Sequence, residues 1–536
     1  MTAAHAVRTF SLTCLLALSL SVAGWIRPAE AQVTAFMQAV AEGAAADRDI
    51  AEFYRSTGYA ALWTGTDRTS AKRREALLRA IEEAPAHGLP AAAYDTAALK
   101  VGLRSVRSER DLGRLEVAMS KLFLTYARDV QTGVLTPAKV DAGIVREVPY
   151  RDRKGLLSAF SKSSPTGFMR ALPPQNPEYV RLMKAKVEFE RLVARGGWGP
   201  EVAASKLEPG QSGQAVVALR NRLIAMGYLK RTATTTYDER MRQAVGAFQA
   251  EHGLDVDGVV GPGTLAEINT GATTRLHQII VAMERERWTN MPRGKRHILV
   301  NIPDFHAQVI DDGKVTFKTR AVVGSDVIDQ RTPEFSDMME HMVINPTWNV
   351  PRSIAIKEYL PLLQRNPYAA GHLRIIDRRG RTVPRDVVDF RQFNERTFPF
   401  DLKQPPSDGN ALGLVKFMFP NRYNIYLHDT PTKNLFGRES RAFSHGCIRL
   451  GDPFDFAYTL LMPQTSDPVG LFQSQLATGR ETIVELEEYI PVHLIYRTAI
   501  APAKGRIQFR RDIYGRDARI WQALQSAGVS SGEVQG

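Results

Sequence analysis

The chain has 536 residues, which exceeds one ordinary hydrophobic core and predicts about three folded units of about 150 residues each. Apolar residues make up 44% and charged residues 24%, a balance that excludes a disordered chain and a protein with many membrane spans. The net charge of +13 favours anionic partners, but basic clusters such as Lys72-Arg73-Arg74 are short and lack interleaved aromatic residues. We therefore expect solvated basic surface and no nucleic-acid partner.

The first 31 residues have the pattern of an export signal. Arg8 precedes an apolar run from Phe10 to Gly24, and Ala29-Glu30-Ala31 supplies a cleavage site of the small-x-small type. This run is shorter than the roughly 20 residues that a membrane-spanning helix needs. We therefore expect a cleaved signal over residues 1–31, with an uncleaved membrane anchor as the less favoured alternative.

Residues 34–200 are predicted to be helical. Turn-forming residues interrupt the helical pattern at Gly88-Leu89-Pro90 and at Leu172-Pro173-Pro174. No stretch of this region has the composition of a catalytic or binding site. A structural or partner-docking role is the expectation.

Residues 204–270 predict a second, smaller helical unit. Apolar residues recur at helical spacing after Gly210 and Gly213, and again before the stretch Asp257–Gly261. Such spacing alone indicates ordinary core packing, but the whole pattern of glycines and aspartate resembles a small helical peptidoglycan-binding domain. An amphipathic connecting helix is expected over 273–290.

Residues 295–500 predict a β-rich domain, since short β-prone segments alternate with turns from about His297 onwards. Within it, residues 354–409 contain many prolines and are too irregular for one regular element. Because long ordered loops in compact domains are usually functional, we expect a lid here, with an inert surface excursion as the alternative. Trp348, just before the lid, fits either a substrate pocket or a core position. Residues 501–536 are expected to form a C-terminal tail.

Cys447 has the clearest chemical signature in the chain. The other cysteine, Cys14, lies inside the predicted signal, so cleavage would leave a lone thiol and no disulfide. In Ser444–Leu450 a glycine permits close approach of a ligand and a histidine flanks the thiol. Upstream, Tyr423–Leu427 predicts a strand, and His428 follows it before a turn. Because a free thiol has a pKa of about 8.5, it needs a nearby base, and His428 is the candidate.

The segment Asn424–Leu450, NIYLHDTPTKNLFGRESRAFSHGCIRL, resembles the active-site signature of the L,D-transpeptidases with a YkuD-type catalytic domain. Nearly all of the chain after residue 31 is similar to the large, periplasmic, multidomain branch of that family. Two departures, Ser407 for an expected glycine and Leu414 for an expected basic residue, concern loop shape. Further matching stretches are Asn345–Pro351, Asn410–Gly413 and Val415–Asn421.

The resemblance implies an α+β multidomain protein of the periplasm. It would combine a helical N-terminal scaffold domain, a small helical peptidoglycan-binding domain, and a β-sandwich-like catalytic domain with a lid insertion. The resemblance implies neither a cofactor nor a metal. The sequence also lacks the His-Glu-x-x-His run of zinc amidases.

The resemblance gives Cys447 the role of acylated nucleophile and His428 that of general base. His445 is either a second polar group beside the thiol or a structural histidine that holds the cysteine loop. Main-chain N–H groups at Gly446 and Cys447 are expected to form the oxyanion hole.

Two further residues have open roles. Arg449 either binds a substrate carboxylate through its planar fork or pairs internally with Asp452 or Asp455, and the internal pair is favoured. Tyr426 is expected to pack near His428, with assistance to the substrate as the alternative.

The implied reaction starts with attack of the Cys447 thiolate on the amide before the terminal D-alanine of a tetrapeptide stem. D-Alanine leaves, and an amine of a second stem attacks the thioester to form a 3-3 cross-link. The expected partners are stem peptides and glycan, with an outer-membrane protein as another acceptor. The alternatives are an L,D-carboxypeptidase, in which water takes the thioester, and a non-catalytic wall-binding scaffold. Carbapenems are expected to acylate Cys447.

Overall fold

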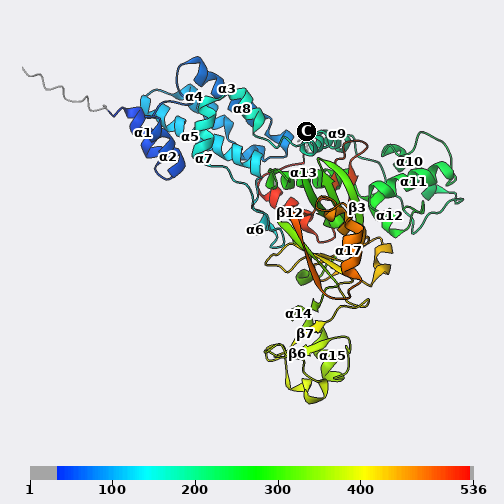
Figure 1. The fold of residues 1–536 in the computed structure, drawn as a ribbon. Helices are drawn as coiled ribbons and strands as arrows, with labels where there is room; N and C mark the ends of the chain where they lie inside the picture. The colour runs from blue at the N-terminus through cyan, green and yellow to red at the C-terminus, as the bar shows by residue number, and fades with distance from the viewer. Residues whose placement is uncertain (1–32, 532–536) are drawn as a thin grey trace, which may run out of the picture.

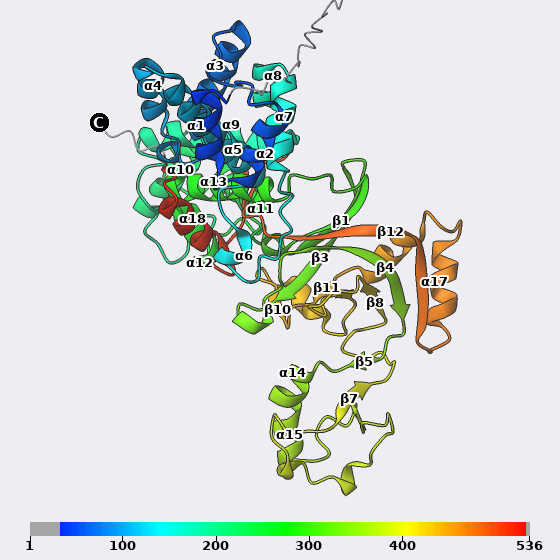
Figure 2. The same ribbon diagram turned by 90° about the vertical axis from the view of Figure 1, so that its left-hand side faces the viewer.

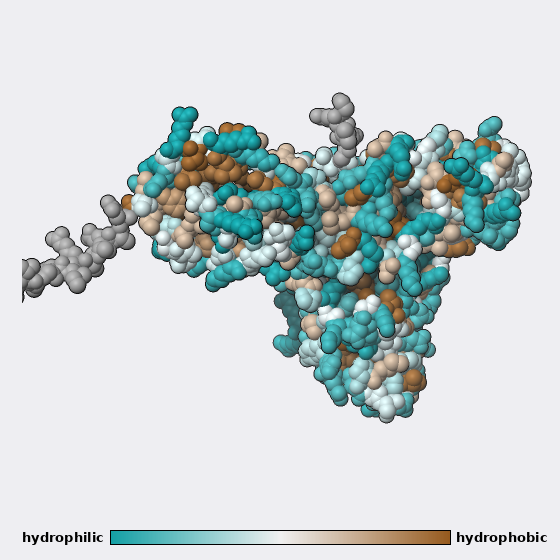
Figure 3. Space-filling model, turned by 90° about the horizontal axis from the view of Figure 1, so that it is seen from above, coloured by the Kyte–Doolittle hydropathy of each residue, from teal (hydrophilic) through white to brown (hydrophobic). Residues whose placement is uncertain are grey.

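The computed structural model describes residues 33–531, so the predicted signal at residues 1–31 lies outside the described part of the chain. A helical N-terminal domain and a small helical module lie at opposite ends of a central β-rich domain, from which an insertion projects (Figures 1 and 2). Within residues 33–531, no helix has the length and apolar character needed to cross a membrane. Seen from above, the surface is mostly hydrophilic, and hydrophobic residues gather over the N-terminal domain (Figure 3).

The N-terminal domain is built around the long helix α5 (Glu109–Thr132). Phe123 of α5 packs against Trp63, with ring centroids 5.6 Å apart. The buried carboxylate of Glu116 accepts hydrogen bonds from the main-chain N–H groups of residues 62–64, which fixes that loop on α5. The other helices of this domain are α1 (Ala35–Ala44), α2 (Arg48–Ser56), α3 (Arg68–Glu82), α4 (Thr96–Ser105), α7 (Arg153–Lys162) and α8 (Pro165–Ala171), whereas α6 (Pro137–Val140) packs on α18 (Arg516–Ser526).

A separate core joins this domain to the β-rich domain. Helix α9 (Pro177–Ala194) packs along α13 (Ala272–Trp288), and α18 (Arg516–Ser526) packs on the same helix. The prediction of a tail over 501–536 is therefore wrong for the described residues, because α18 buries an apolar face whose spacing is that of an amphipathic helix. That face consists of Ile520, Trp521 and Leu524. The hairpin β13 (Ala499–Ile500) and β14 (Gln508–Phe509) completes this core.

Buried ion pairs connect this core to the β-rich domain. Arg285 of α13 lies 2.6 Å from Glu334 and 3.0 Å from Asp517 of α18. Arg516 approaches the same Glu334 at 3.3 Å. Because a buried charge without a partner is costly, these pairs fix the positions of α13 and α18 relative to the β-rich domain.

The small module contains α10 (Gln214–Ala225), α11 (Glu239–Glu251) and α12 (Pro262–Asn269) around an apolar core. Its glycine and aspartate pattern forms a turn against α11. Gln249 donates to Asp257 at 2.8 Å and accepts from the N–H of Gly258 at 2.9 Å. The left-handed φ of 70° at Gly258 explains the glycine there. These residues therefore build the module itself.

The β-rich domain contains a nine-stranded sheet in the order β10-β3-β11-β9-β8-β4-β12-β1-β2, which closes because β2 also pairs with β3. Together with the helical regions, this sheet confirms the predicted α+β class. Phe456 of α16 (Pro453–Leu461) packs on Phe417 inside the sheet, with centroids 4.8 Å apart, and α17 (Pro468–Leu476) covers β4. The strands are β1 (Arg296–Asn301), β2 (His306–Asp311), β3 (Lys314–Gly324), β4 (Ser336–Ile344), β8 (Val415–Met418), β9 (Leu427–His428), β10 (Ala442–Ser444), β11 (Ile448–Leu450) and β12 (Thr482–Ile495).

The insertion has a hydrophobic core of its own. This core starts at Trp348 and ends at Leu412, so the folded unit is wider than the predicted 354–409. Trp348 is 8% exposed and lies edge to face with Tyr359, which makes it a core residue of the insertion. The elements are β5 (Trp348–Asn349), α14 (Arg352–Ile354), α15 (Leu360–Arg365), β6 (Arg374–Ile376) and β7 (Asp401–Gln404).

Candidate active site

Strands β9 and β11 are parallel neighbours, and this pairing brings the two parts of the cysteine signature together. Arg449 of β11 is in register with His428 of β9. Leu427, Ile448 and Leu450 point into the core of the sheet. Because side chains alternate along a strand, His428 and Arg449 share the opposite face, next to Cys447 at the start of β11.

The Cys447 thiol is half-buried and lies in a resting arrangement. Its Sγ donates to the main-chain oxygen of Asn424 at 3.4 Å. Burial raises the pKa of the Cys447 thiol to about 11, against hydrogen bonds from the main chain and side chain of Tyr426 and the charge of Arg449, which lower it. The resting thiol is therefore protonated at neutral pH.

His428 is held as a neutral imidazole. The pKa of His428 is lowered to about 3, chiefly by burial and also by the charge of Arg449, and hydrogen bonds to the Asp429 and Leu412 carbonyls oppose this shift only in part. Nδ1 contacts the main-chain oxygen of Asp429, a group that only accepts, so Nδ1 carries the proton. The other nitrogen, Nε2, then carries the lone pair that can accept a proton, as a general base requires.

Tyr426 lies between these two groups. Its ring is edge to face with the His428 ring at 5.6 Å, and its hydroxyl hydrogen-bonds to the Cys447 sulfur. Among the described residues, no hydrogen bond joins His428 to Cys447. The thiol must therefore turn away from Asn424 before His428 can take its proton.

The loop before Cys447 is pinned by hydrogen bonds. Ser444 Oγ donates to the Cys447 carbonyl at 2.5 Å, and Thr332 Oγ1 donates to the Gly446 carbonyl at 2.7 Å. Gly446 has a φ of 111°, which a side chain would strain. The Gly446 N–H already donates to Ser444 Oγ at 3.1 Å, which leaves the N–H of Cys447 as the candidate donor to an oxyanion.

His445 points away from the thiol, towards the insertion. Its Nε2 lies 2.6 Å from Oε1 of Glu358, in the π-helical segment Ala355–Tyr359 that joins α14 to α15. The structure thus favours the structural role for this histidine over a polar group beside the sulfur. Its partner belongs to the insertion, which sequence reasoning did not anticipate.

Arg449 has no ion pair among the described residues, and its buried Nε has no hydrogen-bond partner. The favoured pair with Asp452 or Asp455 is wrong, because Asp452 instead accepts from Thr319 Oγ1 at 2.8 Å, beyond the end of β11. Burial lowers the pKa of Arg449, while the neighbouring Cys447 raises it. Arg449 therefore remains an uncompensated cation beside Cys447 and His428.

Lys416 is a candidate functional residue that sequence reasoning missed. On β8 it is in register with His428, so Lys416, His428 and Arg449 form one row across three strands. Burial lowers the pKa of Lys416, and Glu481 opposes this effect. The signal was present in the alternation of Val415–Met418, since Val415 and Phe417 are core residues and Lys416 lies between them.

Three family models match the chain. They are the "Scaffold domain" over residues 48–185, the "Putative peptidoglycan binding domain" over 212–268, and the "L,D-transpeptidase catalytic domain" YkuD over 295–470. A protein of Haemophilus influenzae named "Putative L,D-transpeptidase" is 33% identical over 242 residues. That match covers 45% of this chain and 48% of the relative, so the chain spans about half the length of the curated relative.

Solved structures of two L,D-transpeptidases are also similar. The match to one from Xylanimonas cellulosilytica has 16% sequence identity and a TM-score of 0.17, and it covers 55% of this chain and 100% of that chain. The match to one from Stackebrandtia nassauensis has 16% sequence identity and a TM-score of 0.21, and it covers 55% of this chain and 97% of that chain. Over residues 295–470, the chain is similar to the catalytic domain of the L,D-transpeptidases.

Proposed function

We propose that the protein is an exported, periplasmic enzyme that cross-links peptidoglycan stem peptides through a thioester on Cys447. The observation that carries this proposal is the position of Cys447 beside Tyr426, His428 and Arg449 in the matched domain. A half-buried thiol beside an imidazole whose Nε2 can accept a proton is the arrangement that cysteine acyl transfer requires.

In the first half-reaction, His428 Nε2 takes the proton of the Cys447 thiol as Sγ turns from Asn424. The thiolate attacks the amide carbonyl before the terminal D-alanine, and the Cys447 N–H stabilises the oxyanion. The C–N bond breaks, His428 returns its proton to the leaving amine, and D-alanine departs. A thioester remains on Sγ.

In the second half-reaction, an amine of another stem peptide attacks the thioester carbonyl. His428 accepts the proton of that amine, and the thiolate leaves and is reprotonated. A 3-3 cross-link and free Cys447 result. A protein of the outer membrane that offers an amine would be handled by the same steps.

Arg449 and Lys416, the two cations in register with His428, are proposed to bind the stem peptide that is attacked by Cys447. Arg449 and Lys416 flank His428 and are half-buried, so a carboxylate near the scissile amide would find two charged donors there. The insertion is proposed to act as the lid. Two contacts tie it to the catalytic side, Glu358 with His445 and Lys357 with Asp329, each at 2.6 Å.

The products distinguish the outcomes directly. Residues 32–536 would be incubated with disaccharide-tetrapeptide, and the products identified by mass spectrometry. The proposal expects D-alanine and a cross-linked dimer one D-alanine lighter than two substrates. Tripeptide alone would establish an L,D-carboxypeptidase, and unchanged substrate would establish a non-catalytic scaffold.

A further inference from the structure

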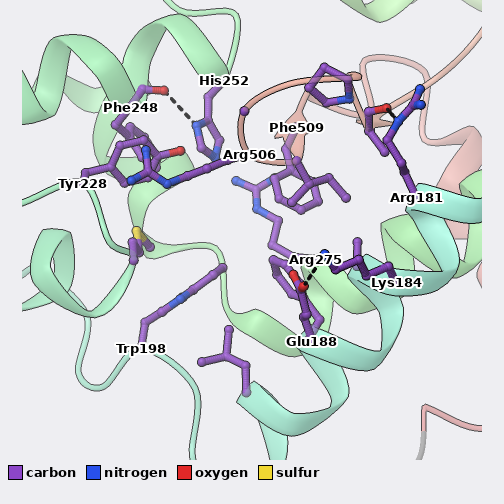
Figure 4. A pocket seen from close by; sticks show the side chains of 18 of the residues that line it. Arg181, Lys184, Glu188, Trp198, Tyr228, Phe248, His252, Arg275, Arg506 and Phe509 are labelled. Carbon is purple, nitrogen blue, oxygen red and sulfur yellow. Dashed lines mark hydrogen bonds and ion pairs between the residues drawn. The ribbon is translucent and has the colours of Figure 1, made fainter. Parts of the chain in front are cut away.

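A cavity of about 550 Å³ lies where three distant segments of the chain meet (Figure 4). Helix α9 and the residues after it form one wall, the small module forms another, and the loop between β13 and β14 closes the third side. The residues that line it are distinct from those of the active site. Its volume lies in the range of about 300–1,000 Å³ that is usual for ligand sites, which often occur between domains.

Two arginines hold this cavity in shape. Arg506, from the β13–β14 loop, lies over the ring of Tyr228 at 4.6 Å and hydrogen-bonds to the carbonyl oxygen of Gly227 in the module. Arg181 of α9 donates to the Ala501 carbonyl at 2.6 Å at the other end of the loop. Because the loop is fixed to both walls, the cavity exists before any ligand binds.

Aromatic rings border the cavity. Phe189 lies edge to face with Trp198 and with Phe509, at 5.7 Å in each case. Tyr228 lies edge to face with Phe248 at 5.4 Å. The phenylalanines are buried, whereas Trp198 and Tyr228 remain partly exposed and border the open centre in Figure 4. Because Arg506 covers the ring of Tyr228, Trp198 is the large, rigid apolar surface that is available to a ligand.

Positive charge exceeds negative charge around the cavity. Of the two lining acids, Glu267 pairs with Arg275 at 2.6 Å and Glu188 lies 4.0 Å from Lys184. Arg195 has no acidic side chain within ion-pairing distance in residues 33–531. The lining cations are Arg181, Lys184, Arg195, Arg275 and Arg506.

We propose that this cavity binds a peptidoglycan fragment, with a sugar ring against Trp198 and a stem-peptide carboxylate on Arg195. A sugar ring presents an apolar C–H face that fits an exposed aromatic ring, and the arginine fork pairs with carboxylates. Peptidoglycan joins both groups in one molecule. The choice of ligand rests on the proposed function, and it extends the module's role to a composite site shared with α9 and the β13–β14 loop. Such a site would tether the enzyme to the wall and raise the local concentration of stem peptides at Cys447.

The test uses calorimetric titration of the full chain with disaccharide-dipeptide. This probe carries the sugars and a carboxylate but lacks the amide that Cys447 would attack, so binding does not report on the active site. We expect Trp198→Ala and Arg195→Glu each to weaken binding at least tenfold. Arg191→Glu, an exposed arginine of α9 that does not line the cavity, should change it less than twofold.

A second probe assigns the two subsites. Uncharged N,N′-diacetylchitobiose should bind Trp198→Ala more weakly than the parent protein and should bind Arg195→Glu as tightly as the parent. The proposal would be overturned if the parent protein did not bind disaccharide-dipeptide. It would also be overturned if both variants bound this probe as tightly as the parent does. If Trp198→Ala fails to fold, the comparison of Arg195→Glu with Arg191→Glu still tests the carboxylate subsite. Both arginines are on the surface, so neither substitution should prevent folding.

D-Alanine release from soluble tetrapeptide is measured in parallel on the same proteins. The cavity variants should retain it within twofold. A parent protein that binds the probe but releases no D-alanine would refute the proposed enzyme and leave the cavity assignment standing.

Discussion

His445 and Glu358 join the catalytic loop to the insertion, with Nε2 and Oε1 2.6 Å apart. The two residues come from segments 87 positions apart in the chain. Both side chains are well exposed, at 39% and 47%, so the pair is screened by water and contributes about 0.5 kcal/mol. Such a weak contact can position a lid and still release it.

Glu358→Gln should therefore loosen the insertion. We expect KM for disaccharide-tetrapeptide to rise two- to threefold, with kcat unchanged, because the reacting groups remain in place. Steady-state D-alanine release measures both constants. Asp386→Asn, another exposed acid of the insertion, is the matched control, and an equal effect in both variants would remove the lid role from Glu358.

The pKa of about 11 for Cys447 predicts an unusual alkylation profile. A thiol is protonated below its pKa, so the rate of iodoacetamide labelling should rise about tenfold per pH unit up to at least pH 10. Labelling is followed by intact mass across pH 6–10. A plateau below pH 9 would show that the Cys447 thiol ionises at a lower pH than this prediction requires.

Tyr426→Phe should slow that labelling. The hydroxyl of Tyr426 hydrogen-bonds to the sulfur and lowers the pKa of Cys447, so its removal costs the thiolate about 1 kcal/mol and reduces the rate three- to tenfold at pH 9. Tyr423→Phe provides the control, since that hydroxyl contacts Arg422 instead. Equal rates in the two variants would assign Tyr426 to packing alone.

Arg449→Met and Lys416→Met test whether the two cations in register with His428 bind the substrate. Each variant removes a charged donor from the face that carries His428, and a hydrogen bond to a charged group contributes about 1.5–3 kcal/mol. We expect kcat/KM for D-alanine release to fall about ten- to hundredfold in each. Arg438→Met, an exposed cation of the segment between β9 and β10, should stay near the parent value. Full activity of both row variants would place substrate binding elsewhere.

Carbapenem acylation tests the nucleophile with a different electrophile. A strained β-lactam carbonyl should acylate Cys447, and the opened ring stays attached because it cannot leave as D-alanine does. Intact mass and peptide mapping should place the adduct on Cys447 and find none in Cys447→Ser or Cys447→Ala. Label on any other residue would contradict the assignment.

The sequence was most informative where chemistry and local pattern coincide. Cys447 and His428 could be predicted because their signature is local, and the α+β class followed from helical and β-prone segments. Arg449 and Lys416 could not be placed, because the register that aligns them with His428 depends on which strands pair in the folded sheet. The His445 contact with Glu358 depends on how the insertion lies on the domain. The packing of α18 could have been predicted from the helical spacing of its apolar residues.

The central claim is that Cys447 carries a thioester, and the most direct test is the intact mass of the protein during turnover of disaccharide-tetrapeptide. The parent protein, quenched in acid, should gain the mass of the substrate less one D-alanine, on a peptide containing Cys447. Cys447→Ala should gain nothing and release no D-alanine, and His428→Ala should form the adduct at least a hundredfold more slowly. D-Alanine release by folded Cys447→Ala at the parent rate would contradict the account.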